Sequence, residues 1–130
     1  MSIPKIRVLI VDDSAVVRQT LSEVLSSDPE LEVIGTASDP FVAAERIAEQ
    51  VPDVITLDIE MPRMDGFDLA RNVRADARLK NIPIIMITSR MADKHRNYAM
   101  EIGVNHYLGK PYQEEQLLEL ITGFIAAQRS

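Results

Sequence analysis

The sequence alternates short apolar runs with longer amphipathic segments, and this alternation constrains the fold more than any other feature. The first apolar run, residues 6–11, is rich in β-branched residues and lacks regular alternation of apolar and polar positions, which is typical of a strand covered on both faces. Similar runs occur at residues 31–37, 54–57, 83–88 and 105–108. Five strand-then-helix units predict a doubly wound, five-stranded parallel α/β sheet, because right-handed crossovers place helices on both faces.

Capping residues and prolines indicate where the helices between these strands begin and end. Ser14 is predicted to cap the first helix, which should stop at Asp28-Pro29. Asp39 is predicted to cap the second helix, with Pro40 at its first position. This second helix should bury four residues at helical spacing, namely Ala43, Ala44, Ile47 and Ala48. The other helices are expected around Phe67, Ala70 and Val73, and over residues 91–102 and 114–128.

Length and composition exclude several classes of protein. At 130 residues the chain has the size of one domain, and we expect residues 1–130 to form a single domain. The net charge of −6 disfavours nucleic acid or an anionic membrane surface as a direct partner. The absence of cysteine excludes disulfides, cysteine zinc sites and thiol nucleophiles. The N-terminal apolar run is too short for a signal segment or a membrane span, so we expect a cytoplasmic protein.

Polar residues stand at the ends of four of the five predicted strands. They are Asp12, Asp13, Asp58, Thr88, Ser89 and Lys110. A single aspartate in such a place is more often a helix cap or a turn former. In an open α/β sheet, however, ligands bind beyond the carboxyl ends of the strands. The agreement of four strand ends therefore favours one site at this edge of the sheet.

The residue types at these strand ends favour a hard cation and a phosphoryl group. Neighbouring carboxylates repel unless a positive group joins them or some pKa values rise. The chain has no cysteine, and His95 and His106 are predicted to be surface or interface residues away from the site, so the ligands would all be oxygen. Such a set favours Mg²⁺, with Mn²⁺ as an alternative, and phosphate oxygens commonly complete the shell. The lysine and threonine could stabilise other phosphoryl oxygens, or one carboxylate could be a nucleophile that accepts the phosphoryl group.

Four motifs, VDDS, LDIEMPRMDG, MITS and LGKP, resemble in order and spacing those of the response-regulator receiver domains of two-component signalling. The resemblance covers residues 6–126 and implies a flavodoxin-like (βα)5 fold with strand order 2-1-3-4-5. Residues 6–67 resemble most the receiver of the chemotaxis methylesterase. Residues 82–121 are more similar to receivers of chemosensory-type hybrid kinases.

The resemblance implies a role for each residue of the site. Asp58 would accept a phosphoryl group from a histidine kinase or a phosphotransfer domain. Asp13 would bind Mg²⁺ directly and Asp12 through water, with Asp58 and the backbone carbonyl of Glu60 completing the protein ligands. Lys110 would pair with the phosphoryl oxygens, and the Lys110-Pro111 peptide bond would be cis.

The resemblance also implies a switch and its partners. Thr88 would move toward the phosphoryl group and vacate space for Tyr107, an aromatic residue that turns inward on activation. The surface of the fourth helix, fifth strand and fifth helix would then bind a downstream target, a fused output domain or a second copy of the chain. Such a protein is not an enzyme in the usual sense, since it catalyses its own phosphotransfer and autodephosphorylation. Glu60 and Arg90 are predicted to tune phosphoryl loss by pairing over the phosphoryl group.

Two other functions remain open from the sequence. A Mg²⁺-dependent phosphatase with an aspartyl nucleophile, of the haloacid-dehalogenase type, also has an acid two residues after its nucleophile, as Glu60 is here. The usual second aspartate of those enzymes is absent from DIEMP. A degenerate receiver acting as a constitutive interaction module is the other alternative, although the acids, Thr88 and Lys110 are all present.

Overall fold

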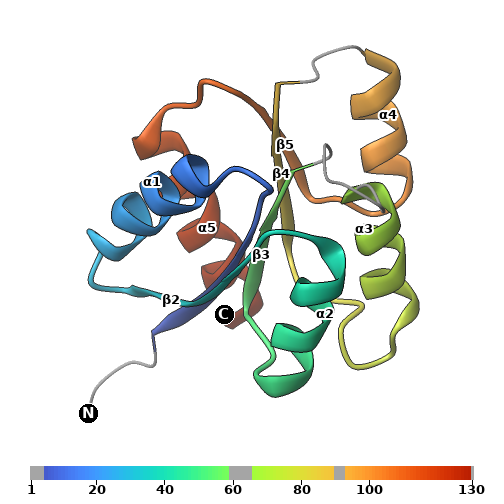
Figure 1. The fold of residues 1–130 in the computed structure, drawn as a ribbon, viewed down its shortest axis with the longest axis horizontal. Helices are drawn as coiled ribbons and strands as arrows, with labels where there is room; N and C mark the ends of the chain where they lie inside the picture. The colour runs from blue at the N-terminus through green and yellow to red at the C-terminus, as the bar shows by residue number, and fades with distance from the viewer. Residues whose placement is uncertain (1–4, 59–65, 90–92, 130) are drawn as a thin grey trace.

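A computed structural model describes residues 5–58, 66–89 and 93–129, and these residues form one parallel sheet with helices on both faces (Figure 1). The strands are β1 (Ile6–Val11), β2 (Leu31–Ala37), β3 (Val54–Leu57), β4 (Ile84–Thr88) and β5 (His106–Gly109). Their order in the sheet is β2-β1-β3-β4-β5, and neighbouring strands run parallel. The predicted fold class and strand order are therefore confirmed.

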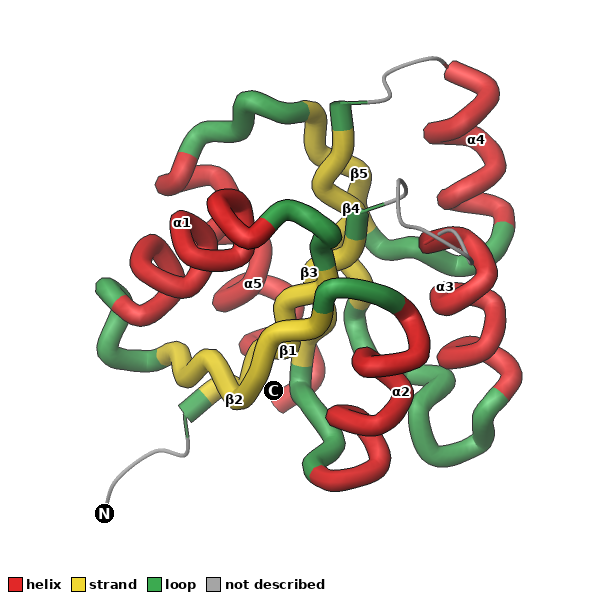
Figure 2. The backbone as a smooth tube through the Cα atoms, viewed as in Figure 1, coloured by secondary structure: helices red, strands yellow, loops and turns green. Residues whose placement is uncertain are grey.

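Within the described residues, five helices cover the sheet. They are α1 (Ala15–Ser26), α2 (Pro40–Glu49), α3 (Gly66–Ala75), α4 (Asp93–Glu101) and α5 (Glu114–Arg129). Helices α1 and α5 lie against one face, and α2, α3 and α4 lie against the other (Figure 2). The predicted caps are confirmed, since the Ser14 hydroxyl accepts from the Val17 N–H and the Asp39 carboxylate accepts from two N–H groups of α2. No helix within the described ranges is long and apolar enough to cross a membrane.

The two faces of the sheet bury two separate apolar cores. Along β4, Ile85 and Ile87 belong to the core beneath α1 and α5, whereas Ile84 and Met86 belong to the core beneath α2, α3 and α4. All four side chains are buried. Burial on both faces explains why the strand sequences are apolar at consecutive positions instead of alternating.

The burial predicted for α2 is only half correct. Ala43 and Ile47 are buried against the sheet, but Ala44 and Ala48 are exposed. Helix α2 covers the β2 edge of the sheet from one side only, so the residues that face the sheet are spaced four apart along one narrow stripe. Ala44 and Ala48 instead line a hollow of about 340 Å³ between α2 and α3.

Element boundaries differ from the predictions by one or two residues. Strand β4 begins at Ile84, one residue later than predicted, because Pro83 has no N–H for the ladder and contributes only its carbonyl, which accepts from the Ile55 N–H at 3.0 Å. Strand β5 is shifted one residue toward the C-terminus, to His106–Gly109. Helix α4 is described from Asp93 onward and ends at Glu101.

Candidate functional site

Backbone hydrogen bonds carry the parallel ladder one residue beyond the strands and fix the backbones of the site. The Asp12 N–H donates to the Ala37 carbonyl at 3.0 Å, and the Asp58 N–H donates to the Val11 carbonyl at 3.0 Å. Because β1 lies between β2 and β3, these bonds place Asp12 and Asp58 side by side at the carboxyl edge of the sheet. The apolar runs that precede the two aspartates thus deliver them to one place.

Three carboxylates gather at this edge, as the strand ends predicted. One carboxylate oxygen from each of Asp12, Asp13 and Asp58 lies within 4.8 Å of the others. Asp12 and Asp58 are buried, with 2% and 6% of their surfaces exposed, and Asp13 is exposed. A set of carboxylates with one open side fits a hard divalent cation, which takes a few protein oxygens and keeps several waters. Asp12, Asp13 and Asp58 are therefore the residues that could hold Mg²⁺.

Lys110 supplies a positive charge to the two buried carboxylates. Its Nζ atom lies 3.0 Å from Asp12 Oδ2 and 3.5 Å from Asp58 Oδ2. Burial by itself would lower the pKa of Lys110, but the hydrogen bond to Asp12 and the charges of both aspartates outweigh it, so the pKa is raised above its usual value. Lys110 is therefore a firmly charged ammonium between two carboxylates. The Lys110-Pro111 bond is cis, as predicted.

Asp12 is held in place from several sides. Its Oδ1 atom accepts a hydrogen bond from the Ser14 N–H at 2.9 Å, and its Oδ2 atom accepts from Lys110. Its backbone carbonyl accepts from Nη1 of Arg18 at 2.8 Å. Sequence reasoning missed Arg18. The available signal was its spacing, because a long cation in the second turn of a helix that begins beside acids can reach back to the helix start.

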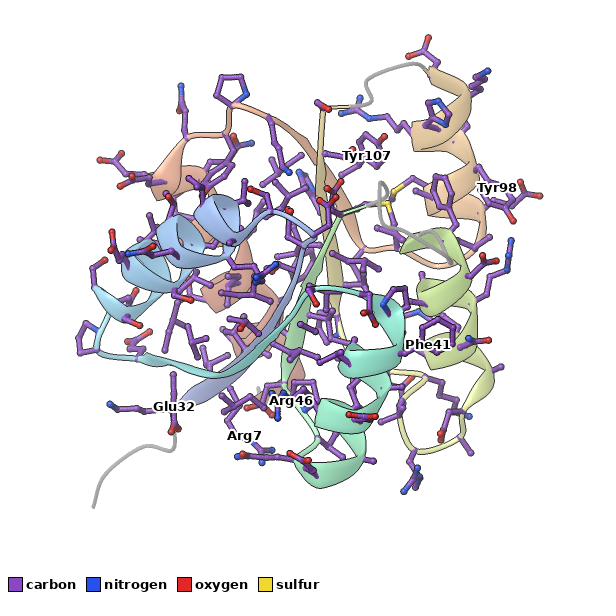
Figure 3. All side chains as sticks on the ribbon, in the orientation of Figure 1. Arg7, Glu32, Phe41, Arg46, Tyr98 and Tyr107 are labelled. Atoms are coloured by element: carbon purple, nitrogen blue, oxygen red, sulfur yellow. The ribbon has the colours of Figure 1, made fainter. Side chains whose placement is uncertain are left out.

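Thr88 and Tyr107 lie toward the core beneath α2, α3 and α4. Tyr107 belongs to the core beneath α2, α3 and α4, and Thr88 follows Met86 of the same core by two residues. Thr88 is fully buried, and Tyr107 is 3% exposed, so its ring lies inward in this structure (Figure 3). The guanidinium of Arg96 from α4 lies 5.8 Å from the centre of the Tyr107 ring.

Comparison with known proteins assigns the chain to a family. The family model described as the response regulator receiver domain matches residues 8–122. The chain belongs to this family. Its four motifs thus mark a true receiver sequence, and the resemblance drawn from them is confirmed.

Relatives of this receiver include much longer proteins. It is 53% identical over 109 residues to a protein-glutamate methylesterase/protein-glutamine glutaminase of Rhodospirillum rubrum, covering 82% of this chain and 29% of that protein. A protein of the same name from Geobacter metallireducens is 47% identical over 134 residues, covering 97% of this chain and 37% of that protein. The chain thus spans about a third of the length of these relatives, and the Geobacter alignment includes both of its halves.

Solved structures confirm the receiver fold. The response regulator domain of Thermotoga maritima CheB superimposes with a TM-score of 0.84 at 32% sequence identity, covering 94% of this chain and 97% of that chain. The sequence relatives and this solved structure agree, since both are receivers of the methylesterase type.

Two residues predicted to tune the site lie outside the described ranges, and two histidines lie away from it. Glu60 and Arg90 lie outside the described residues, so their proposed ion pair stays a prediction. His95 and His106 are away from the acidic cluster, as predicted, and both are half-buried. His95 stacks on Phe67 of α3, with ring centres 6.4 Å apart. Burial, followed by the charge of Arg96, lowers the pKa of His106.

Proposed function

We propose that this receiver is a phosphorylation-dependent switch in which Asp58 accepts a phosphoryl group from a histidine kinase or a phosphotransfer domain. The observation that carries the proposal is the position of the Lys110 ammonium, which contacts both buried carboxylates beside Asp13. In such an arrangement a fixed positive charge is already present where a phosphoryl group would add negative charge. A bound Mg²⁺ would neutralise part of the charge on the phosphoryl oxygens, and Asp12, Asp13 and Asp58 are the residues that would hold it.

The surroundings of the three acids favour Asp58 as the nucleophile. Both carboxylate oxygens of Asp12 are engaged, one by the Ser14 N–H and the other by Lys110. Asp13 is exposed, and its carboxylate has no hydrogen bond within the described part of the chain, so no group orients it for attack. Asp58 stands at the end of a central strand, with Lys110 at 3.5 Å.

The proposed reaction is a simple displacement. One carboxylate oxygen of Asp58 attacks the phosphorus of a phosphohistidine on the partner. The phosphorus–nitrogen bond breaks, its electron pair remains on the imidazole, and an aspartyl phosphate forms. Lys110, which contacts Asp58, would pair with the new phosphoryl oxygens, and the buried Thr88 hydroxyl would move toward them. Hydrolysis by water would reverse the switch, at a rate that Glu60 and Arg90 would tune.

The proposed response is a change of the surface formed by α4, β5 and α5. Tyr107 lies inward between β5 and α4 and contacts Arg96, so it connects the strand next to Thr88 with α4. We infer that this surface binds the output of the switch. The names of the relatives favour a chemotaxis-type pathway in which the output is a methylesterase domain, fused or separate. A cytoplasmic location and pairing with a second copy through the same surface complete the proposal.

The test is to incubate the protein with acetyl phosphate and Mg²⁺ and to follow its intact mass. We expect one phosphoryl group per chain, lost in Asp58→Asn and retained in Asp53→Asn, a matched change at the opposite end of β3. Multiple turnover of the phosphodonor with no stable adduct would indicate the phosphatase, and no adduct under any condition would indicate a degenerate receiver. An adduct of equal yield in Asp58→Asn would contradict the assignment of Asp58.

A further inference from the structure

Arg18 links the first helix to the acidic cluster. It lies in the second turn of α1, and its half-buried side chain extends back to the carboxyl end of β1. Its Nη1 atom donates to the Asp12 carbonyl oxygen at 2.8 Å, while its backbone N–H donates to the Ser14 carbonyl at 3.0 Å. One residue thus holds the chain on both sides of Asp13.

The carbonyl that Arg18 binds belongs to the peptide group that joins Asp12 to Asp13. A peptide group is planar, so a hydrogen bond that fixes its oxygen also fixes the Cα atom of Asp13. Asp13 is exposed, and its carboxylate has no hydrogen bond of its own within the described residues. Among the described residues, it is therefore the backbone that sets where the Cα–Cβ bond of Asp13 points, and no hydrogen bond of the carboxylate adds to this.

We propose that Arg18 is a positioning residue for the divalent cation, acting through the Asp12–Asp13 peptide. This inference rests on the function proposed for the acidic cluster and adds a residue that touches neither the cation nor the phosphoryl group. Groups that orient metal ligands in this way commonly change metal affinity by about 10- to 100-fold when they are removed. A cationic side chain donating to a carbonyl also makes a stronger hydrogen bond than a neutral donor.

The charge of Arg18 has an opposite effect, and the two effects predict different results. A guanidinium beside a cation site repels the cation, so removal of this charge would tighten binding if repulsion dominated. Loss of the hydrogen bond would weaken binding if positioning dominated. The side chain is partly open to solvent, where screening reduces repulsion, whereas a hydrogen bond at 2.8 Å acts directly on the peptide. The structure therefore assigns the larger effect to positioning.

The experiment measures Mg²⁺ affinity by isothermal titration calorimetry with no phosphodonor present, in wild type, Arg18→Met, Arg18→Lys and Arg78→Met. Arg78 is 77% exposed and lies after α3, so its variant removes the same charge away from the acidic cluster. We expect Arg18→Met to bind Mg²⁺ about 10-fold more weakly and Arg78→Met to match wild type. Arg18→Lys keeps the charge but has a shorter reach, and it should recover part of the loss.

A second readout separates positioning from general stability. Amide exchange of Asp13 and Ser14 in the metal-free protein should be faster in Arg18→Met, with global unfolding midpoints close to wild type. In phosphorylation by acetyl phosphate, the Mg²⁺ concentration at half-maximal rate should rise while the rate at saturating Mg²⁺ stays the same.

The possible failures are distinct. Unchanged or tighter Mg²⁺ binding by Arg18→Met, or an equal loss in Arg78→Met, would overturn the role of Arg18 and leave the proposed function standing. A wild-type protein that binds no Mg²⁺ would contradict both proposals together. Loss of the Asp58 adduct in wild type, with the Mg²⁺ affinities as expected, would overturn the proposed function alone.

Discussion

Asp13 offers the cleanest perturbation of the acidic cluster. It is exposed, and its carboxylate has no hydrogen bond within the described residues, so Asp13→Asn removes a charge without breaking a contact. Asparagine has nearly the same shape as aspartate. In the absence of a divalent cation, we therefore expect the substitution to stabilise the protein by relieving repulsion from Asp12 and Asp58.

The magnitude follows from the separation of the carboxylates. At 4.8 Å, the largest separation within the cluster, two unit charges repel by about 0.9 kcal/mol in water and by about 3.5 kcal/mol at an effective dielectric constant of 20. Because Asp13 is exposed, the value near that of water applies to each of its two neighbours. The nearby ammonium of Lys110 attracts Asp13 and offsets part of this repulsion. We expect the free energy of unfolding to rise by about 1 kcal/mol.

The assay is urea unfolding followed by far-ultraviolet circular dichroism, in EDTA and again in MgCl₂. Mg²⁺ should reverse the order of stabilities, because a ligand at 100 times its Kd adds about 2.7 kcal/mol and the variant has lost a ligand. Glu23→Gln, an exposed charge change on α1, is the control. The reasoning fails if Asp13→Asn is no more stable than wild type in EDTA, or if Glu23→Gln is stabilised equally.

Three further predictions concern single residues. The buried hydroxyl of Thr56 has no hydrogen-bond partner in the part of the chain that the structure describes. The isosteric Thr56→Val should therefore raise the free energy of unfolding by about 1 kcal/mol. Urea unfolding measures this change, and a loss of stability would contradict the prediction. The Arg74 guanidinium donates to three backbone carbonyls and to the Asn105 side chain, a set of bonds that lysine cannot reproduce. Arg74→Lys should therefore lower the free energy of unfolding in urea by about 2 kcal/mol. A variant as stable as wild type would contradict this. The raised pKa of Lys110 means that its stabilising pairing with Asp12 is complete below the unfolded-state pKa and is lost as pH rises through the folded-state value. The difference in urea stability between wild type and Lys110→Met should therefore stay constant up to the usual lysine range and shrink above it, and a decline beginning near neutral pH would refute this.

Local patterns were enough to predict the sheet and most of its contacts. The caps Ser14 and Asp39 and the proline before β4 act within a few residues, so the printed sequence contains their physical cause. The exposure of Ala44 and Ala48 could not be predicted in the same way, because it depends on the distance between α2 and α3. An apolar stripe shows that a helix packs on one side, but not how far that contact extends around the helix.

The residues of the site also divide into those that strand order alone brings together and those that depend on helix placement. Asp12, Asp58 and Lys110 could be predicted because parallel strands bring their carboxyl ends to one edge, whatever the helices do. Arg18 could not, since its reach depends on how α1 is tilted over β1. The packing of Phe67 against Tyr98 also depends on helix placement, with ring centres 4.9 Å apart between α3 and α4.

The weak attachment of α4 gives a physical reason for the proposed direction of the switch. Ala99 is the one buried residue of α4, whereas α1, α2 and α3 each bury three or more. Among the described residues, the other contacts of α4 include Tyr98 against Phe67 of α3 and Arg96 over the Tyr107 ring. The Lys110 N–H donates to the Thr88 carbonyl at 2.9 Å, so the end of β5 that leads to Lys110 is joined directly to the end of β4. Elements with few buried contacts move at the lowest cost in free energy. If a charge change at Asp58 shifts these strand ends, we therefore expect α4 to move more readily than α1, α2 or α3.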